Sequence, residues 1–163
     1  MYILHCTKKL LDRLRIPAAS SLRPPTTVLG NWYATAFFWK PQVALFVNER
    51  TLLPMLMPLA PASTAIQRLP SELATLLAMH GGNQAFIATE VAGMSEVSIA
   101  KTANRSVVGT MNEFAFLADG YREYMETTDL LALSVRLAET PCSAIKYDSP
   151  SGLIKEVFGA SPS

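Results

Sequence analysis

The chain has 163 residues, of which 50% are hydrophobic and 17% are charged, and its formal net charge is +1. This length fits one domain that buries a sizeable core without a disulfide or a metal, and the composition excludes a disordered chain. The near-neutral charge gives no overall electrostatic footprint for nucleic acid. The low charge also predicts an apolar surface, which favours a protein partner or a homo-oligomer.

The charges are unevenly distributed along the chain. Residues 1–50 hold seven basic and two acidic residues, whereas residues 51–163 hold seven basic and eleven acidic residues. A basic front attracts polyanions, but the same pattern is typical of solvated charge that folding intermixes. Aromatic residues between positions 32 and 39 are able to stack on bases, yet aromatics in a strand pair are more typical of a core or a dimer contact. Nucleic acid is therefore a weakly supported partner.

No targeting or membrane-spanning segment is expected. The first residues place their charges after a short apolar run, which is the reverse of a signal peptide. The longest uncharged stretch, residues 51–67, contains three prolines and is shorter than the ~20 apolar residues of a membrane span. We therefore expect a cytoplasmic protein without membrane association.

The two cysteines, Cys6 and Cys142, are too few for a disulfide framework. They are interpreted as small buried side chains in a reducing compartment. His5 and Cys6 are adjacent in a predicted strand and therefore point to opposite faces. No metal site and no cofactor are predicted.

The first predicted elements are a strand over residues 2–6 and a helix that begins after Thr7. The run YILHC is typical of a short strand, and the leucines of TKKLLDRL recur on one helical face with basic residues opposite. Thr7 is the predicted N-cap. Prolines and serines then predict a loop that ends near Gly30, and its length is typical of a mobile or functional segment.

Residues 32–39 and 43–48 give the clearest strand signal, because both runs are rich in aromatic and β-branched side chains. The second run is apolar throughout, which predicts a central strand covered on both faces. Residues 51–58 predict a third strand, and Pro54 confines it to an edge or a bulge.

A helical region follows these strands. Thr64 and Gln67 fit a capping box, and the helical pattern stops at a pair of glycines at positions 81–82. Pro70 is expected to divide the region into two short helices, because a proline inside a helix removes a backbone hydrogen bond.

Residues 83–92 fit either a helix or a strand, and residues 95–102 alternate like a strand. Thr110 and Glu113 form a second capping box. Apolar residues recur behind it at helical spacing as far as Met125, so the longest helix is predicted to begin at Thr110.

Residues 129–138 and 151–158 predict two closing helices, and residues 159–163 a frayed tail. Together these elements predict a single α+β domain over residues 1–158. We expect a small, mostly antiparallel sheet covered by several helices.

A polar corner at residues 101–112 is the candidate binding site. It spans the end of a strand and the start of the longest helix, where free backbone N–H groups and the helix dipole suit an anion. Lys101 and Arg105 add two cationic donors, and an arginine binds a phosphate or carboxylate in bidentate fashion. The candidate ligand- or partner-binding residues are Lys101, Asn104, Arg105, Ser106, Gly109 and Asn112.

The polar corner also fits a purely structural role. Asn and Ser are common turn residues, a glycine ahead of a helix supplies backbone freedom, and Glu113 is a nearby carboxylate for Arg105. The segment is neither a P-loop nor a dinucleotide fingerprint, because it holds one glycine and no GK[ST] follows.

Catalytic residues are not evident from the sequence. The chain has two histidines, His5 and His80, and no GxSxG elbow, so no hydrolytic triad is predicted. We therefore expect a non-enzymatic binding or accessory module, with a protein partner favoured over nucleic acid. The alternative is an enzyme that acts on a phosphorylated or carboxylated small molecule at the polar corner, where no base or metal ligand is apparent.

Four motifs run in order along the chain: HCTKKLLDRL, FVNERTLLPMLMP, KTANRSVVGTMNEF and LSVRLAETPCSAIKYDSP. With CTKKLL near the start and a KTxNRSVxGxMNxF core, the chain resembles a family of bacterial proteins known only as a domain of unknown function. The resemblance covers nearly the whole chain and implies a single full-length domain in a bacterium. It implies no activity, cofactor or catalytic residue.

Overall fold

The computed structural model describes residues 1–125 and 129–160, which contain a five-stranded sheet and six α-helices. The strands are β1 (Tyr2–Cys6), β2 (Trp32–Phe37), β3 (Val43–Asn48), β4 (Pro54–Pro58) and β5 (Val97–Lys101). The α-helices are α1 (Lys8–Leu14), α2 (Ala65–Met79), α3 (Gln84–Ala92), α4 (Arg105–Met125), α5 (Leu130–Leu137) and α6 (Pro150–Ala160). Two short 3-10 helices are η1 (Ala62–Thr64) and η2 (Ser143–Ile145).

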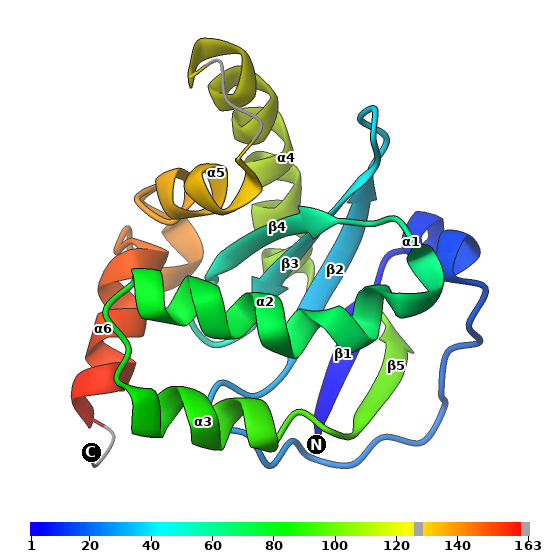
Figure 1. The fold of residues 1–163 in the computed structure, drawn as a ribbon. Coiled ribbons are helices and arrows are strands. Elements are labelled where there is room, and N and C mark those ends of the chain that lie inside the picture. The colour runs from blue at the N-terminus through cyan, green and yellow to red at the C-terminus, as the bar shows by residue number, and fades with distance from the viewer. Residues whose placement is uncertain (126–128, 161–163) are drawn as a thin grey trace.

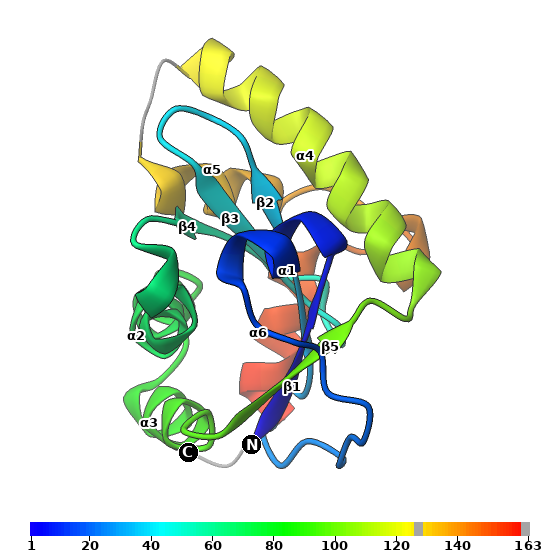
Figure 2. The ribbon, with the colours of Figure 1, turned by 90° about the vertical axis from the view of Figure 1, so that its right-hand side faces the viewer.

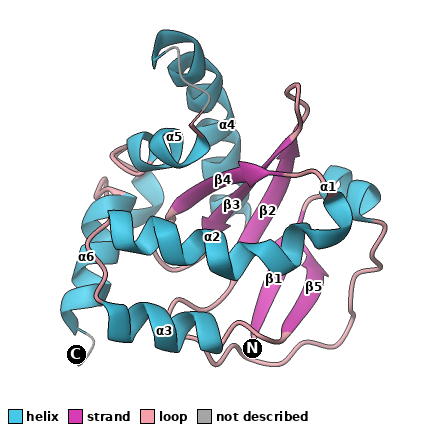
Figure 3. Ribbon diagram, in the orientation of Figure 1, coloured by secondary structure: helices cyan, strands magenta, loops and turns pink. Residues whose placement is uncertain are grey.

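The α+β class is confirmed, but the sheet is mixed, so the predicted mostly antiparallel sheet is wrong. The strand order is β4-β3-β2-β1-β5. β1 runs parallel to both of its neighbours, β2 and β5, whereas β2, β3 and β4 are antiparallel (Figures 1 and 3). The physical reason is the connection after β1. There α1 and a long loop bring the chain back to the end of the sheet at which β1 begins, so β2 runs in the same direction as β1.

Helices cover both faces of the sheet, with α2 and α3 on one side and α4 on the other (Figure 2). The first core includes side chains of α1, α2, α3 and α6, and the second includes side chains of α4 and α5. β3 is consequently buried along its whole length and lies inside the sheet, as its apolar sequence predicts.

Both edge strands form hydrogen bonds with other parts of the chain. β4 forms one edge, as Pro54 predicts, and its Leu56 N–H donates to the buried Ser134 hydroxyl of α5 at 2.8 Å. On the opposite edge, the Ala19 N–H donates to the Ile99 carbonyl of β5 at 2.7 Å. These contacts reduce the number of free backbone groups that an edge strand offers to another chain.

α1 and α2 begin directly after Thr7 and Thr64, as predicted, but neither threonine side chain caps its helix and Pro70 does not divide α2. α2 continues through Pro70, so the predicted division is wrong; a buried leucine stripe, including Leu69 and Leu73, holds both sides of the proline against the sheet. The Thr64 side chain makes no cap hydrogen bond in α2. Thr7 occupies the N-cap position of α1, but its hydroxyl pairs with the Thr35 hydroxyl at 2.9 Å instead of capping the helix.

The ambiguous segment over residues 83–92 contains a helix. Asn83 caps α3, because its side chain accepts a hydrogen bond from the Phe86 N–H at 2.7 Å. This side-chain cap decides between the two structures that the apolar pattern allowed.

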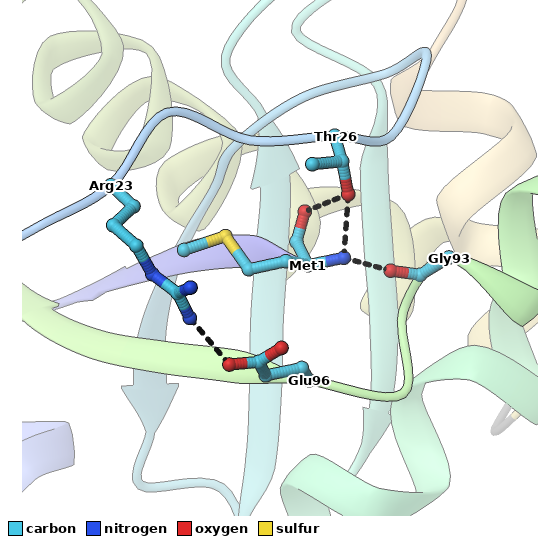
Figure 4. A network of polar contacts seen from close by, with 5 residues as sticks. All are labelled: Met1, Arg23, Thr26, Gly93 and Glu96. Atoms are coloured by element: carbon cyan, nitrogen blue, oxygen red, sulfur yellow. Dashed lines mark hydrogen bonds and ion pairs between the residues drawn. The ribbon is translucent and has the colours of Figure 1, made fainter.

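Polar contacts anchor the long loop between α1 and β2 to residues that immediately precede β1 and β5 (Figure 4). Arg23 forms an ion pair with Glu96 at 2.5 Å, immediately before β5. The Met1 amino group donates to the Thr26 hydroxyl at 2.9 Å and to the Gly93 carbonyl. The loop therefore follows the β1–β5 side of the molecule and is anchored there.

A buried carboxylate fixes the last part of this loop. Glu90 of α3 is buried and accepts hydrogen bonds from the Val28 N–H at 3.0 Å and the Leu29 N–H at 3.1 Å. Burial raises the pKa of the Glu90 carboxyl, and the two backbone donors oppose that rise. Arg50 adds a hydrogen bond to the Val28 carbonyl.

Over residues 1–125 and 129–160, the structure contains no helix with the length and apolar character that crossing a membrane requires.

Candidate functional site

The longest helix begins one and a half turns earlier than predicted. α4 starts at Arg105, and the Asn104 side-chain oxygen accepts from the Ser106 N–H at 3.0 Å and the Val107 N–H at 3.3 Å. The predicted Thr110–Glu113 capping box is therefore wrong. Thr110 lies inside the helix, partly because its hydroxyl is satisfied there by the Ser106 carbonyl at 3.1 Å.

The Asn104 cap changes what the start of α4 offers to an anion. Two of the N–H groups that an uncapped helix leaves free are already bound by the Asn104 side chain. The remaining attraction comes from Lys101 and Arg105, whose side chains are exposed. Neither forms an ion pair with any described residue, so the predicted structural pairing of Arg105 with Glu113 does not occur.

The predicted site residues divide into two groups. Lys101, Asn104, Arg105 and Ser106 lie together at the turn from β5 into α4, which we call the β5–α4 corner (residues 101–106). Gly109 and Asn112 lie on the exposed side of α4. Asn112 is seven residues beyond Arg105, or about 10 Å along the helix axis.

Two residues that the sequence did not indicate support the β5–α4 corner from behind. The His5 Nδ1 atom lies 2.8 Å from the Lys101 carbonyl, and the His5 ring stacks on Tyr33 with centroids 4.6 Å apart. The Tyr33 hydroxyl accepts from the Asn104 N–H at 2.9 Å. Burial raises the pKa of the Tyr33 phenol. Parallel pairing of β1 with β5 creates this contact, and no local sequence signal predicts it.

The side of α4 that faces away from the sheet carries an exposed stripe at helical spacing. We call it the outer stripe, and its members are Arg105, Gly109, Asn112, Phe116, Gly120 and Glu123. The Phe116 side chain is 79% exposed. Figure 2 shows α4 running along the outside of the molecule with no other element covering it.

The two glycines of the outer stripe have no visible role within the chain. A Cβ atom added at Gly109 or Gly120 would meet nothing within 4 Å, and neither glycine has a positive φ. A glycine inside an exposed helix costs about 1 kcal/mol relative to alanine. The stability of the chain itself therefore does not explain them.

A shallow hollow adjoins the C-terminal half of α4. Its volume is about 670 Å³, and its lining includes Phe116, Tyr121, Tyr124 and Arg136. Arg136 lies over the Tyr121 ring at 4.9 Å, and the Tyr124 side chain is 87% exposed. Aromatic side chains thus extend from Phe116 of the outer stripe toward α5.

The described residues contain no group of three or more His, Cys, Asp or Glu side chains placed to hold a metal ion. Cys6 and Cys142 are both buried. Burial raises the pKa of the Cys6 thiol to about 12, and burial together with Glu113 raises that of Cys142 to about 11. Thiols with such pKa values are poor nucleophiles at neutral pH.

Comparison with known families agrees with the resemblance seen in the motifs. The family described as "Domain of unknown function (DUF6933)" matches residues 3–152. The chain belongs to this family. The DUF6933 match extends from β1 to the start of α6 and so includes the β5–α4 corner and the outer stripe. Searches of curated proteins and of solved structures found no match.

Proposed function

We propose that this DUF6933 protein is a non-enzymatic binding module that docks a protein partner on the outer face of α4. The observation that carries the proposal is the exposure of Phe116 (79%) and Tyr124 (87%) on a helix whose opposite face is buried between Val107 and Ala118. Aromatic side chains are enriched at protein interfaces, because they bury a large area at low conformational cost. The module acts in the cytoplasm, where its buried thiols stay reduced.

The β5–α4 corner contributes the charged end of this surface. Lys101 and Arg105 are exposed and lack an ion pair among the residues that the structure describes. They suit an acidic side chain of a partner, because an arginine binds a carboxylate in bidentate fashion. Nucleic acid is less well supported, since Asp119 and Glu123 lie further along the exposed side of the same helix.

The test replaces Phe116 with the photo-reactive residue p-benzoylphenylalanine in the full-length chain within its own host cells. The matched control carries the same residue at Leu22, which is 42% exposed on the loop beside β5. We expect one adduct of defined mass from position 116 and none from position 22. Introducing Arg105→Glu into the same chain should reduce the yield of the adduct from position 116. Equal adducts from both positions, or none from position 116, would contradict the proposal.

A second candidate function is an enzyme that acts on a phosphorylated or carboxylated small molecule at the β5–α4 corner. The observation in its favour is topological: the carboxyl ends of parallel β1 and β5 lie side by side, and α1 and α4 leave them toward opposite faces. Open α/β sheets often bind ligands at such a point.

Titration with inorganic phosphate and with acetate separates the two functions. An enzyme site predicts saturable NMR shifts at the amides of Asn104, Arg105 and Ser106, and Arg105→Ala should abolish them. The binding module predicts small, non-saturating shifts that salt suppresses.

A further inference from the structure

The outer stripe is nearly symmetric about the level of Phe114 in α4. Arg105 lies nine residues before Phe114 and Glu123 nine residues after it, whereas Asn112 and Phe116 lie two residues to either side. Gly109 and Gly120 lie five residues before and six residues after the same level. When such a helix is turned end over end, its arginine meets a glutamate and its glycines meet glycines.

We propose that the partner is a second copy of this chain, which packs its α4 antiparallel against the outer stripe about a two-fold axis at the level of Phe114. This inference rests on the proposed function, because it uses the same face of α4. A two-fold interface is self-complementary by symmetry. It places Arg105 opposite the partner's Glu123, and Gly109 within one residue of the level of the partner's Gly120.

Charge complementarity selects the second copy and the antiparallel direction. Arg105 and Glu123 are exposed, and neither is ion-paired within residues 1–125 and 129–160. A parallel pair would bring arginine against arginine and glutamate against glutamate, which is repulsive. The antiparallel pair forms two equivalent ion pairs, and it also opposes the two helix dipoles. A partner of uniform charge would leave one end of the stripe unmatched.

The glycines and Phe116 fit a close helix pair. Side chains at a contact set the separation of packed helices, usually 8–10 Å, and facing glycines permit the short end of that range. Since nothing lies within 4 Å of the positions where Gly109 and Gly120 would carry Cβ atoms, that space is free for a second helix. Phe116 then loses its exposure by packing against the partner's Asn112 and Gly109.

The interface is one helix pair, which is smaller than the about 800 Å² per partner of a typical stable complex. We therefore expect a dimer that dissociates on dilution. Sedimentation velocity of the full chain over a range of concentrations should show a shift from monomer to dimer. Phe116→Ser should suppress this shift, whereas Leu22→Ser, the exposed control on the loop, should leave it unchanged.

Charge reversal tests the register. Arg105→Glu alone and Glu123→Arg alone should each weaken self-association by about tenfold or more, because each converts two attractions into two repulsions. An equimolar mixture of the two variants should restore association, since both pairs are attractive in the heterodimer. Misfolding is a poor explanation for a loss of self-association in these variants. Glutamate near the start of a helix and arginine near its end both interact favourably with the helix dipole.

The outcomes separate this inference from the proposed function. A wild-type chain that stays monomeric at all concentrations, or a mixture that fails to recover association, would overturn the second copy as partner. An adduct at position 116 with the mass of a different protein would overturn it too, while leaving the proposed function in place. An adduct with twice the mass of the chain supports both.

Discussion

His80 follows α2 with a buried imidazole whose Nε2 atom has no hydrogen-bond partner among the described residues. Burial lowers the pKa of this imidazole, and the nearby Lys155 ammonium of α6 lowers it further. His80 and Lys155 line one hollow together with Glu139. The imidazole is therefore held neutral in the folded chain.

The neutral imidazole predicts that folding stability falls as the pH drops through about 6.5, the ordinary histidine pKa. Because the folded-state pKa is lowered, the unfolded chain binds a proton in this range that the folded chain does not bind. His80→Leu removes this contribution. We expect its free energy of unfolding in urea to fall less than that of wild type between pH 7.5 and 5.5.

Glu90→Gln is the matched control for His80→Leu, because the two groups titrate with opposite effects. The raised pKa of Glu90 lets the folded chain keep a proton that the unfolded chain has lost, so its contribution to stability grows as the pH falls. In Glu90→Gln, the free energy of unfolding should therefore fall more steeply with decreasing pH than in wild type. Identical pH slopes in wild type and His80→Leu would contradict the assignment.

The start of α4 is the helix boundary at which the sequence prediction and the structure differ most clearly. Thr110 and Glu113 match a capping box in type and spacing, but Asn104 is an equally good cap six residues earlier and has the advantage of tertiary support. Its backbone N–H is bound by Tyr33 from β2. Local sequence could not rank the two starts, because the deciding partner lies 71 residues away along the chain.

Asn104→Ala should therefore destabilise the chain by about 1 kcal/mol, since it removes the acceptor for two helix N–H groups. Glu113→Ala is the control from the wrongly predicted box, and we expect a change of less than about 0.5 kcal/mol at this exposed position. Thermal unfolding followed by circular dichroism measures both. A larger destabilisation by Glu113→Ala than by Asn104→Ala would instead support the Thr110–Glu113 capping box.

Gly120 offers a variant in which stability and association change in opposite directions. Gly120→Ala should stabilise the monomer by about 0.5 to 1 kcal/mol, because alanine is the better helix former and nothing obstructs its Cβ. The same methyl group should weaken self-association by holding the two helices apart. Thermal unfolding at low concentration measures the stability, and sedimentation at high concentration measures self-association. A Gly120→Ala variant that gained both stability and self-association would argue against close glycine packing.

At the scale of the whole molecule, the sequence predicted where strands lie better than how they pair. Strand runs at residues 2–6, 32–39, 43–48 and 95–102 correspond to β1, β2, β3 and β5. Their apolar and β-branched composition is a local property. The parallel pairing of β1 with β2 and β5 is not, because it depends on where long connections return the chain.

The same limit applies to the candidate site. The sequence predicts a strand-to-helix corner over residues 101–112 because the local pattern changes there, and the structure has this turn between Lys101 and Arg105. His5, Tyr33 and Phe116 had no such signal. The first two depend on strand pairing, and the exposure of Phe116 depends on which face of α4 meets the sheet.

The two buried cysteines report on whether the two faces of the sheet unfold together. Cys6 belongs to the core shared by α1, α2, α3 and α6, and Cys142 belongs to the core under α4 and α5. Both thiols have raised pKa values and are shielded, so an alkylating reagent modifies them only when the surrounding core opens.

Because β2 and β3 contribute side chains to both cores, opening one face removes support from the other. We therefore expect a single cooperative transition, in which pulsed alkylation in urea modifies Cys6 and Cys142 at the same midpoint, as measured by peptide mass spectrometry. Agreement with the circular dichroism midpoint serves as the control. If Cys142 became reactive at a clearly lower urea concentration, the α4–α5 face would open on its own, and the outer stripe would belong to a separately unfolding unit.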